Sequence, residues 1–359
     1  MFNVFAPLFL KYPSWIHPEI FPGIPVLGNI RWYGLMYVLA FGTAYFVLRQ
    51  VLREGALDQL PVDGKNGYKA TEEDMGSFIT WGIICLLIGA RVFSTLVYDT
   101  TGTYWRKPWL IFWPFDPETK QFTGLAGMSY HGGFIGGFLG MTLWCIKHKR
   151  PVLRWIDAMA IAIPLGYTFG RLGNFFNGEL FGRITTMPWG MVFPYAERFP
   201  TNQEWVVELC QKLGIAFEGQ RFVNLPRHPS QLYEALFEGI ILFAIIWNLR
   251  KKKPFDGFFT AIYTAGYGIF RFIIEYFREP DADLGYRISS NGSTELYKNT
   301  SLLNISTGQI LCFLMIVFAV TITIVQIIRK KKGKCLEIPQ WHKAVKIQPE
   351  KTSNKTSKK

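Results

Sequence analysis

Cysteine and histidine are scarce in this sequence, and their spacing argues against metal and redox chemistry. Five cysteines and five histidines are spread over 359 residues, and no CxxC pair or His–Cys group has metal-ligand spacing. Cys85, Cys145 and Cys312 lie within long apolar runs, where cysteine usually serves packing. The sequence therefore predicts no metal site, no redox centre and no cofactor.

Charged residues are also sparse, which argues against a soluble enzyme. Only 18% of the residues are charged, whereas 49% are hydrophobic and 16% aromatic. A transmembrane helix needs about 20 predominantly apolar residues, and we predict an all-α membrane protein with about seven such helices. The predicted spans are residues 30–52, 78–98, 131–147, 155–177, 231–249, 257–276 and 308–328.

The N-terminus has no predicted cleavable signal peptide, because it lacks a basic start followed by an apolar core. Residues 1–29 are instead rich in Phe, Pro and Trp, and we expect an interfacial segment. Residues 30–328 form the predicted membrane domain, in which 195–227 is a small outer head and 282–307 an outer loop. The basic residues 329–359 predict a disordered cytoplasmic tail.

Acidic residues are outnumbered, 26 against 39 Lys and Arg, which gives a formal net charge of +13. The excess is concentrated in KHKR (147–150), RKKK (250–253) and RKKKGK (329–334), each directly after a predicted span. Short basic loops mark the cytoplasmic side and contact anionic lipids. This distribution argues against nucleic-acid binding, and it predicts an N-terminus outside and a C-terminus inside.

With this topology, five predicted spans place polar side chains at the same outer depth. Ionisable residues inside a membrane are costly and therefore indicate a function. The polar residues at this depth are Tyr33, His131, Arg171, Asn174, Gln231, Glu234, Arg271 and Glu275. We predict a functional site where these helix ends converge.

Helical spacing places several of these residues on common faces. The positions that share a face are Tyr267, Arg271, Glu275 and Arg278 near one span, and Gln231, Glu234 and Glu238 on another. With Arg171 and Arg183 nearby in sequence, cations can outnumber the acids that neutralise them. Arginine binds phosphate through two parallel hydrogen bonds, so we expect a lipid phosphate as the extra anion. A purely structural ion-pair network is the alternative.

His131 and Asp157 stand apart from the arginines. A histidine at the mouth of a span beside an anion site can move protons near neutral pH. The glycines that follow it, Gly132, Gly136 and Gly140, are predicted to pack against a neighbouring helix. Asp157 lies near the cytoplasmic side, where we expect a structural hydrogen bond or ion pair.

Several stretches of the chain resemble the prolipoprotein diacylglyceryl transferase family of bacterial membrane enzymes. GRLGNFFNGELFG (170–182) resembles the signature stretch of that family. The other matching stretches, in the family's order, are RWYGLMY (31–37), HGGFIGG (131–137), WGMVFP (189–194), RHPSQLYEA (227–235) and YGIFRFIIEYFREPD (267–281). The long outer segments 195–224 and 282–307, the start TGQILCFLMIV of the last span, and the Lys-rich tail depart from the family pattern.

The resemblance implies an activity in the bacterial inner (cytoplasmic) membrane. The diacylglyceryl group of phosphatidylglycerol would pass to the lipobox cysteine of an exported prolipoprotein, with release of glycerol phosphate. The catalytic residues that it implies are His131, Arg171 and Arg271. The binding residues that it implies are Tyr33, Asn174, Glu179, Gly182, Tyr267 and Glu275, to which shared helix faces add Gln231 and Arg278. Asp157 matches a functionally sensitive acid.

The residues also suit this chemistry without the resemblance. A thiol must lose its proton before it attacks carbon, and a leaving phosphate needs preorganised cations. His131 is the candidate base, with a water or the phosphate itself as alternatives. Two other classes stay open: an anion or phospholipid transporter, which would also use intramembrane arginines, and a non-catalytic scaffold.

Overall fold

A computed structural model describes residues 9–24, 30–60, 67–99, 102–115, 128–280, 285–290, 295–298, 300–336 and 338. Most of the predicted tail, both ends of the predicted interfacial segment and part of the predicted outer loop lie outside the described residues. The chain divides into two compact units. The first unit comprises Met1–Val47, Met159–Pro254 and Phe258–Cys335, and the second comprises Leu48–Ala158, Phe255–Gly257 and Leu336–Lys359.

Every predicted span corresponds to a helix. The helices are α1 (Trp32–Arg53), α2 (Glu72–Val97), α4 (Tyr130–Lys147), α5 (Val152–Phe176), α9 (Phe258–Ile274), α10 (Thr307–Lys331) and the continuous helix Ser230–Lys252. This last helix consists of α7 (Ser230–Glu234), the π-helix η3 (Ala235–Ile241), α8 (Leu242–Leu249) and η4 (Arg250–Lys252). The remaining elements are β1 (Leu10–Lys11), α3 (Thr103–Arg106), η2 (Pro108–Phe112), β2 (Met191–Val192), β3 (Arg198–Pro200), α6 (Glu204–Leu213), β4 (Phe222–Asn224), β5 (Tyr286–Ile288) and β6 (Ile305–Ser306).

Five helices among the described residues are long and apolar enough to cross a membrane: α1, α2, α5, the helix Ser230–Lys252 and α10. The helix α9 is apolar but has only 17 residues. The helix α4 has 18 residues, which include His131, Lys147 and five glycines. The helical membrane class is therefore confirmed, and the count of seven spans stays a prediction.

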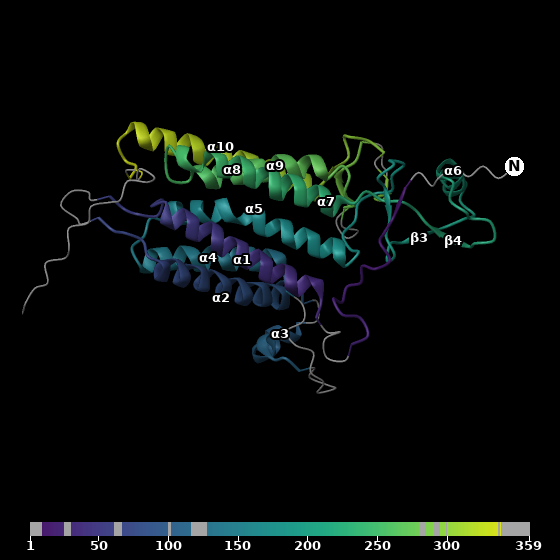
Figure 1. The fold of residues 1–359 in the computed structure, drawn as a ribbon, viewed down its shortest axis with the longest axis horizontal. Helices are drawn as coiled ribbons and strands as arrows, with labels where there is room; N and C mark the ends of the chain where they lie inside the picture. Colours follow the sequence, from purple (N-terminus) through teal and green to yellow (C-terminus); the bar gives the residue numbers. More distant parts are fainter. Residues whose placement is uncertain are drawn as a thin grey trace, which may run out of the picture. The chain divides into compact units, whose positions relative to one another are not determined.

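Within the second unit, α2 and α4 lie side by side at a distance that glycine sets (Figure 1). A Cβ atom on Gly136 would lie 2.2 Å from the carbonyl oxygen of Cys85, and one on Gly89 would lie 2.4 Å from that of Gly132. Small residues allow membrane helices such close approach. The predicted packing role of the glycines after His131 is confirmed.

A buried polar cluster joins distant segments of the second unit. Arg154 is 1% exposed, its Nη2 lies 3.0 Å from Asp256 Oδ2, and its Nη1 donates to the carbonyl of Asp58 at 2.5 Å. Nearby in sequence, Asp157 Oδ2 accepts a hydrogen bond of 2.8 Å from the backbone of Gly257. Asp157 thus makes a structural contact between two chain segments that are 100 residues apart.

Within the first unit, α9 lies beside α10 and next to α7 and α8 (Figure 1). Gly268 faces α10, since a Cβ atom there would lie 3.0 Å from the carbonyl oxygen of Cys312. The helix α10 begins with a capping box, in which the Gln309 backbone N–H donates to Ser306 Oγ and the Ser306 backbone N–H donates to Gln309 Oε1. Gln309 Nε2 also donates to the carbonyl of Phe272 at 3.4 Å, which links the N-terminal end of α10 to the end of α9.

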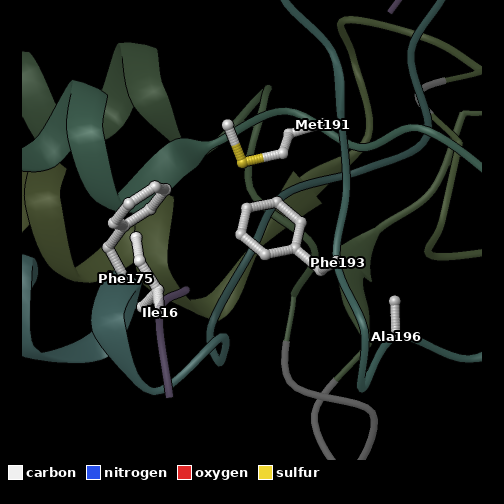
Figure 2. Packing of buried hydrophobic residues seen from close by; sticks show 5 residues of the cluster. All are labelled: Ile16, Phe175, Met191, Phe193 and Ala196. Atoms are coloured by element: carbon white, nitrogen blue, oxygen red, sulfur yellow. The ribbon is translucent and has the colours of Figure 1, made fainter. Parts of the chain in front are cut away.

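A small apolar core forms where α5 ends, as Figure 2 shows. Its buried residues are Ile16, Phe175, Met191, Phe193 and Ala196. The hydroxyl of Tyr12 donates to the carbonyl of Phe175 at 2.8 Å, and β1 pairs with β2. The described part of the predicted interfacial segment therefore packs on the end of α5 and on the segment around β2.

Within segment 195–227, the structure places an antiparallel pair of strands and one helix. Strands β3 and β4 pair, and α6 packs on them through Val206 and Cys210, which contact Val223 in one buried cluster. These elements lie beyond the N-terminal end of α7 (Figure 1). The predicted small head therefore has a core of its own.

Candidate functional site

Three helices of the first unit bring arginines that are largely buried together with one fully buried carboxylate. Glu234 on α7 is fully buried, and its Oε2 lies 2.8 Å from Arg171 Nε and 2.8 Å from Arg271 Nη1. Its Oε1 lies 3.5 Å from Arg278 Nη1, just after α9. Together with their neighbours Glu238 and Glu275, these residues form what we call the arginine–glutamate cluster.

The hydroxyl group of Tyr167 contacts Arg171, Glu234 and Glu238 of this cluster. Tyr167 lies four residues before Arg171 on α5, and Arg171 Nε donates to its hydroxyl at 2.7 Å. The hydroxyl in turn lies 2.5 Å from Glu238 Oε2 and 3.2 Å from Glu234 Oε2. The rings of Tyr167 and Tyr267 are perpendicular to each other, with their centroids 5.7 Å apart. The guanidinium group of Arg171 is therefore held in one orientation.

Glu275 is held by the start of α10. Its Oε2 lies 3.2 Å from Arg271 Nη2, and its Oε1 accepts a hydrogen bond of 3.0 Å from Ser306 Oγ. A Cβ atom on Gly308 would lie only 2.8 Å from Glu275 Oε1. The absence of a side chain at Gly308 thus leaves room for this carboxylate.

The expected excess of cations is wrong for this cluster, because three guanidinium groups face three carboxyl groups. Arg183, which the sequence grouped with them, binds elsewhere: its Nε donates to the carbonyl of Arg278 at 2.7 Å and its Nη1 to that of Lys298 at 3.2 Å. Glu238 adds the third acid through Tyr167. Attraction for an anion must therefore come from the arrangement of donors rather than from the net count.

Five buried polar atoms around the cluster make no hydrogen bond of good geometry within the described part of the chain, although three of them lie in the ion pairs given above. They are Arg271 Nη1, Gln231 Oε1, Glu234 Oε1, Glu238 Oε1 and Glu275 Oε2. Buried polar atoms are normally paired, and an unmade hydrogen bond costs about 1–3 kcal/mol. A ligand that combines acceptor oxygens with hydroxyl donors would satisfy both kinds of atom.

The loop after α5 orients Arg171 from the other side. Arg171 Nη1 donates to Asn174 Oδ1 at 3.3 Å, and Asn174 Nδ2 donates to Glu179 Oε1 at 2.9 Å. Gln231 Nε2 holds the backbone of this loop by donating to the carbonyl of Glu179 at 2.5 Å. Leu180 has a left-handed backbone, with φ of 54°, and such strain concentrates at functional sites.

Gly182 allows its backbone to lie very close to the backbone of two other segments. A Cβ atom there would lie 2.2 Å from the carbonyl oxygen of Phe277. Its N–H donates to the carbonyl of His228 at 2.8 Å. Because only glycine fits, this residue fixes the loop between α7 and the end of α9, and its contact with a lipid stays a prediction.

His228 was missing from the predicted site, and Glu234 was placed there without a binding role, although both lie in the stretch RHPSQLYEA. His228 Nδ1 lies 3.1 Å from the hydroxyl of Tyr233. Burial, together with the charge of Arg183, lowers the pKa of His228 to about 4. This imidazole is therefore neutral at physiological pH. The motif was visible in the sequence, but nothing in it showed that one glutamate would contact three arginines.

The remaining predicted residues lie at two places. Tyr33 on α1 packs on α5, since a Cβ atom on Gly173 would lie 3.1 Å from its ring. His131 belongs to the second unit, where it is exposed in the first turn of α4 with Nδ1 3.4 Å from the Tyr98 hydroxyl. No group of three or more metal-ligating side chains occurs within the described ranges. The role of His131 as a base stays a prediction.

Comparison with known proteins gives the family of this chain. The family model described as prolipoprotein diacylglyceryl transferase matches residues 22–325. Three relatives are named phosphatidylglycerol--prolipoprotein diacylglyceryl transferase: that of Treponema denticola is 52% identical over 335 residues (91% of this chain, 97% of the relative), that of Treponema pallidum 53% over 313 (86% and 92%), and that of Borreliella burgdorferi 40% over 338 (91% and 97%). The matched region contains α5, α7 and α9 with the whole arginine–glutamate cluster. The chain therefore belongs to the prolipoprotein diacylglyceryl transferase family.

Proposed function

We propose that this multi-pass membrane protein transfers the diacylglyceryl group of phosphatidylglycerol to the cysteine thiol of a prolipoprotein, and that the arginine–glutamate cluster holds the lipid phosphate. The observation that carries the proposal is the contact of one buried carboxylate, Glu234, with three arginines. It fixes the guanidinium groups before any ligand arrives. Preorganised donors of this kind stabilise charge that develops during a reaction.

The residues fit the bond changes of this transfer. The thiolate sulfur attacks the glycerol carbon that carries the phosphate, so a C–S bond forms and a C–O bond breaks. The bonding electrons pass to the phosphate oxygen, and glycerol phosphate leaves. Arg171 and Arg271 would donate hydrogen bonds to the phosphate oxygens, whose negative charge grows as the bond breaks. Asn174 and Tyr167 keep Arg171 oriented.

The proton of the thiol needs an acceptor, and His131 is the proposed one. Its exposed imidazole lies at the N-terminal end of α4, and histidine is the side chain that most often acts as a general base. His131→Asn should lower the transfer rate strongly at neutral pH and should recover part of it at alkaline pH, where the thiol ionises unaided. A low rate that does not change with pH would assign His131 another role.

The finer topology belongs to the same proposal. Seven spans with the N-terminus outside place the arginine–glutamate cluster, at the ends of α5, α7 and α9, at the outer leaflet of a bacterial inner membrane. The basic runs at 147–150, 250–253 and 329–334 support this orientation, and the lipobox of an exported precursor would then reach the site. Reporters fused after Lys149 and Lys252 should both respond as cytoplasmic, and an outside response at both would reverse the assignment.

A transfer assay with purified protein separates the enzyme from a transporter. In micelles that contain phosphatidylglycerol, a synthetic peptide with a lipobox cysteine should gain the mass of one diacylglyceryl group. A matched serine peptide should stay unmodified, because its hydroxyl is almost wholly protonated at neutral pH whereas a thiol is partly ionised. An unmodified cysteine peptide, together with movement of anions or lipids across vesicles that contain the protein, would favour a transporter.

A further inference from the structure

Among the described residues, Glu238 is the one carboxylate of the arginine–glutamate cluster that forms no ion pair with an arginine. It lies in the π-helix η3, fully buried, and π-turns inside helices often mark functional positions. The next residue, Gly239, fixes its place: a Cβ atom there would lie 2.0 Å from Thr168 Oγ1 on α5. The wide turn therefore holds Glu238 tightly against α5.

The two oxygens of this carboxyl group have different surroundings. Oε2 accepts the hydrogen bond of 2.5 Å from the Tyr167 hydroxyl. Oε1 is shielded from solvent and has no hydrogen-bond partner in the described ranges. Leaving such an acceptor unpaired is costly, so Oε1 is suited to a donor that a ligand brings.

The position of this acceptor relates it to the phosphate site. One hydroxyl group, that of Tyr167, separates Glu238 from Arg171 Nε. The same hydroxyl lies 3.2 Å from Glu234 Oε2, which contacts Arg271. The part of a lipid headgroup that follows the phosphate would therefore come within reach of Glu238 Oε1. Arg271 Nη1, which is ion-paired with Glu234 but makes no hydrogen bond of good geometry within the described residues, would face the phosphate itself.

The charges around Glu238 favour a neutral donor over a cation. An ammonium group at this position would approach the guanidinium groups of Arg171 and Arg271, and like charges at such short range repel strongly where water is excluded. A hydroxyl group donates a hydrogen bond without that repulsion. The geometry thus suits a polyol headgroup better than an ethanolamine headgroup.

We infer that Glu238 Oε1 accepts a hydrogen bond from a hydroxyl group of the glycerol headgroup, and that this contact selects phosphatidylglycerol among the phospholipids. The inference rests on the proposed function, because it assigns a further residue to the same lipid. Glu238 is thus a specificity-determining residue, with Tyr167 as the group that orients it. Arg171 and Arg271 bind the phosphate that all phospholipids share.

A competition between donors tests the inference, because the acyl chains of the product reveal which lipid was used. The two donors are phosphatidylglycerol and phosphatidylethanol, which lacks the headgroup hydroxyls. They are mixed in one micelle with different acyl chains, and the experiment is repeated with the acyl chains exchanged between the two lipids. Phosphatidylethanolamine replaces phosphatidylethanol in a second experiment. Mass spectrometry of the lipidated cysteine peptide gives the product ratio, which does not depend on the amount of folded protein.

Wild-type protein should prefer phosphatidylglycerol at least about tenfold, the ratio expected for one hydrogen bond to a buried acceptor. In Glu238→Gln, the amide oxygen keeps the bond from Tyr167 and the NH₂ group replaces Oε1, so a donor faces the headgroup. The preference should then fall at least about fivefold. Glu208→Gln, the same change on the exposed face of α6, should leave the ratio unchanged.

Equal use of phosphatidylglycerol and phosphatidylethanol by the wild type would overturn the inference while leaving the proposed function intact. So would an unchanged ratio in Glu238→Gln. If that variant gives too little product to measure, its thermal stabilisation by glycerol phosphate and by propyl phosphate replaces turnover. The wild type should favour glycerol phosphate and the variant should not, and equal behaviour of the two proteins would contradict the assignment. Failure of every donor with the wild type would instead count against the proposed function.

Discussion

Arg171→Ala and Arg271→Ala should each reduce lipid transfer at least about 100-fold, the usual loss when one preorganised donor to a developing charge is removed. Each guanidinium group lies 2.8 Å from Glu234 and would face the lipid phosphate on its other side. Lysine should restore little activity, because a point charge cannot form two parallel hydrogen bonds. The measurement is peptide lipidation in membranes that contain equal amounts of each protein.

Arg198→Ala is the matched control for these variants. Arg198 is exposed on β3, so its loss should change the transfer rate less than about twofold, as is usual for surface positions. Near-normal activity of Arg171→Ala or Arg271→Ala at equal protein level would show that the arginine concerned only ties helices together. That result would support the structural ion-pair network over the phosphate site.

Glu234→Gln should also abolish most of the activity, although Glu234 need not touch the substrate. Removing its charge leaves Arg171, Arg271 and Arg278 facing one another, and breaking a buried ion pair costs roughly 3–5 kcal/mol. We expect a loss of at least about 100-fold in the transfer rate, because the guanidinium groups would no longer be fixed. Glu234→Asp, which keeps the charge, should recover part of that loss.

A variant of a second ion pair distinguishes loss of function from loss of stability. Glu279 binds Arg227 outside the arginine–glutamate cluster, and its side chain is 25% exposed, so Glu279→Gln removes a less buried glutamate–arginine pair in the same unit. It should lower the melting temperature but leave most of the transfer rate in the folded fraction. If Glu234→Gln and Glu279→Gln lose activity in proportion to their stability alone, the special role of Glu234 is wrong.

Much of the cluster was predictable, because ionisable residues inside a membrane are costly and therefore indicate a functional site. Depth and helical spacing selected Arg171 and Arg271 from different spans, and the structure places both against Glu234. Helical spacing also placed Gln231, Glu234 and Glu238 on one face of a span. In the structure, Glu234 and Glu238 both contact the hydroxyl group of Tyr167. Spacing within a helix is local, and the sequence therefore determines it directly.

The balance of charges was not predictable, because it depends on contacts between distant segments. Arg183 lies close to the site in sequence, yet its guanidinium group binds the carbonyls of Arg278 and Lys298. In the sequence, Tyr167 is an ordinary aromatic residue of an apolar span. Only the structure shows that it contacts Glu234 on α7 and Glu238 in η3. The π-helix that holds Glu238 has no local sequence signal, and its Gly239 packs closely against Thr168 on α5, a contact between distant segments.

The position of the phosphate in a complex tests the central claim most directly. An experimental structure with a phosphorothioate analogue of phosphatidylglycerol would locate that group through the anomalous signal of its sulfur. We predict phosphate oxygens within about 3.2 Å of guanidinium nitrogens of both Arg171 and Arg271, which is hydrogen-bonding distance. A bound lipid whose phosphate lies away from both arginines, with the cluster closed upon itself, would contradict the account.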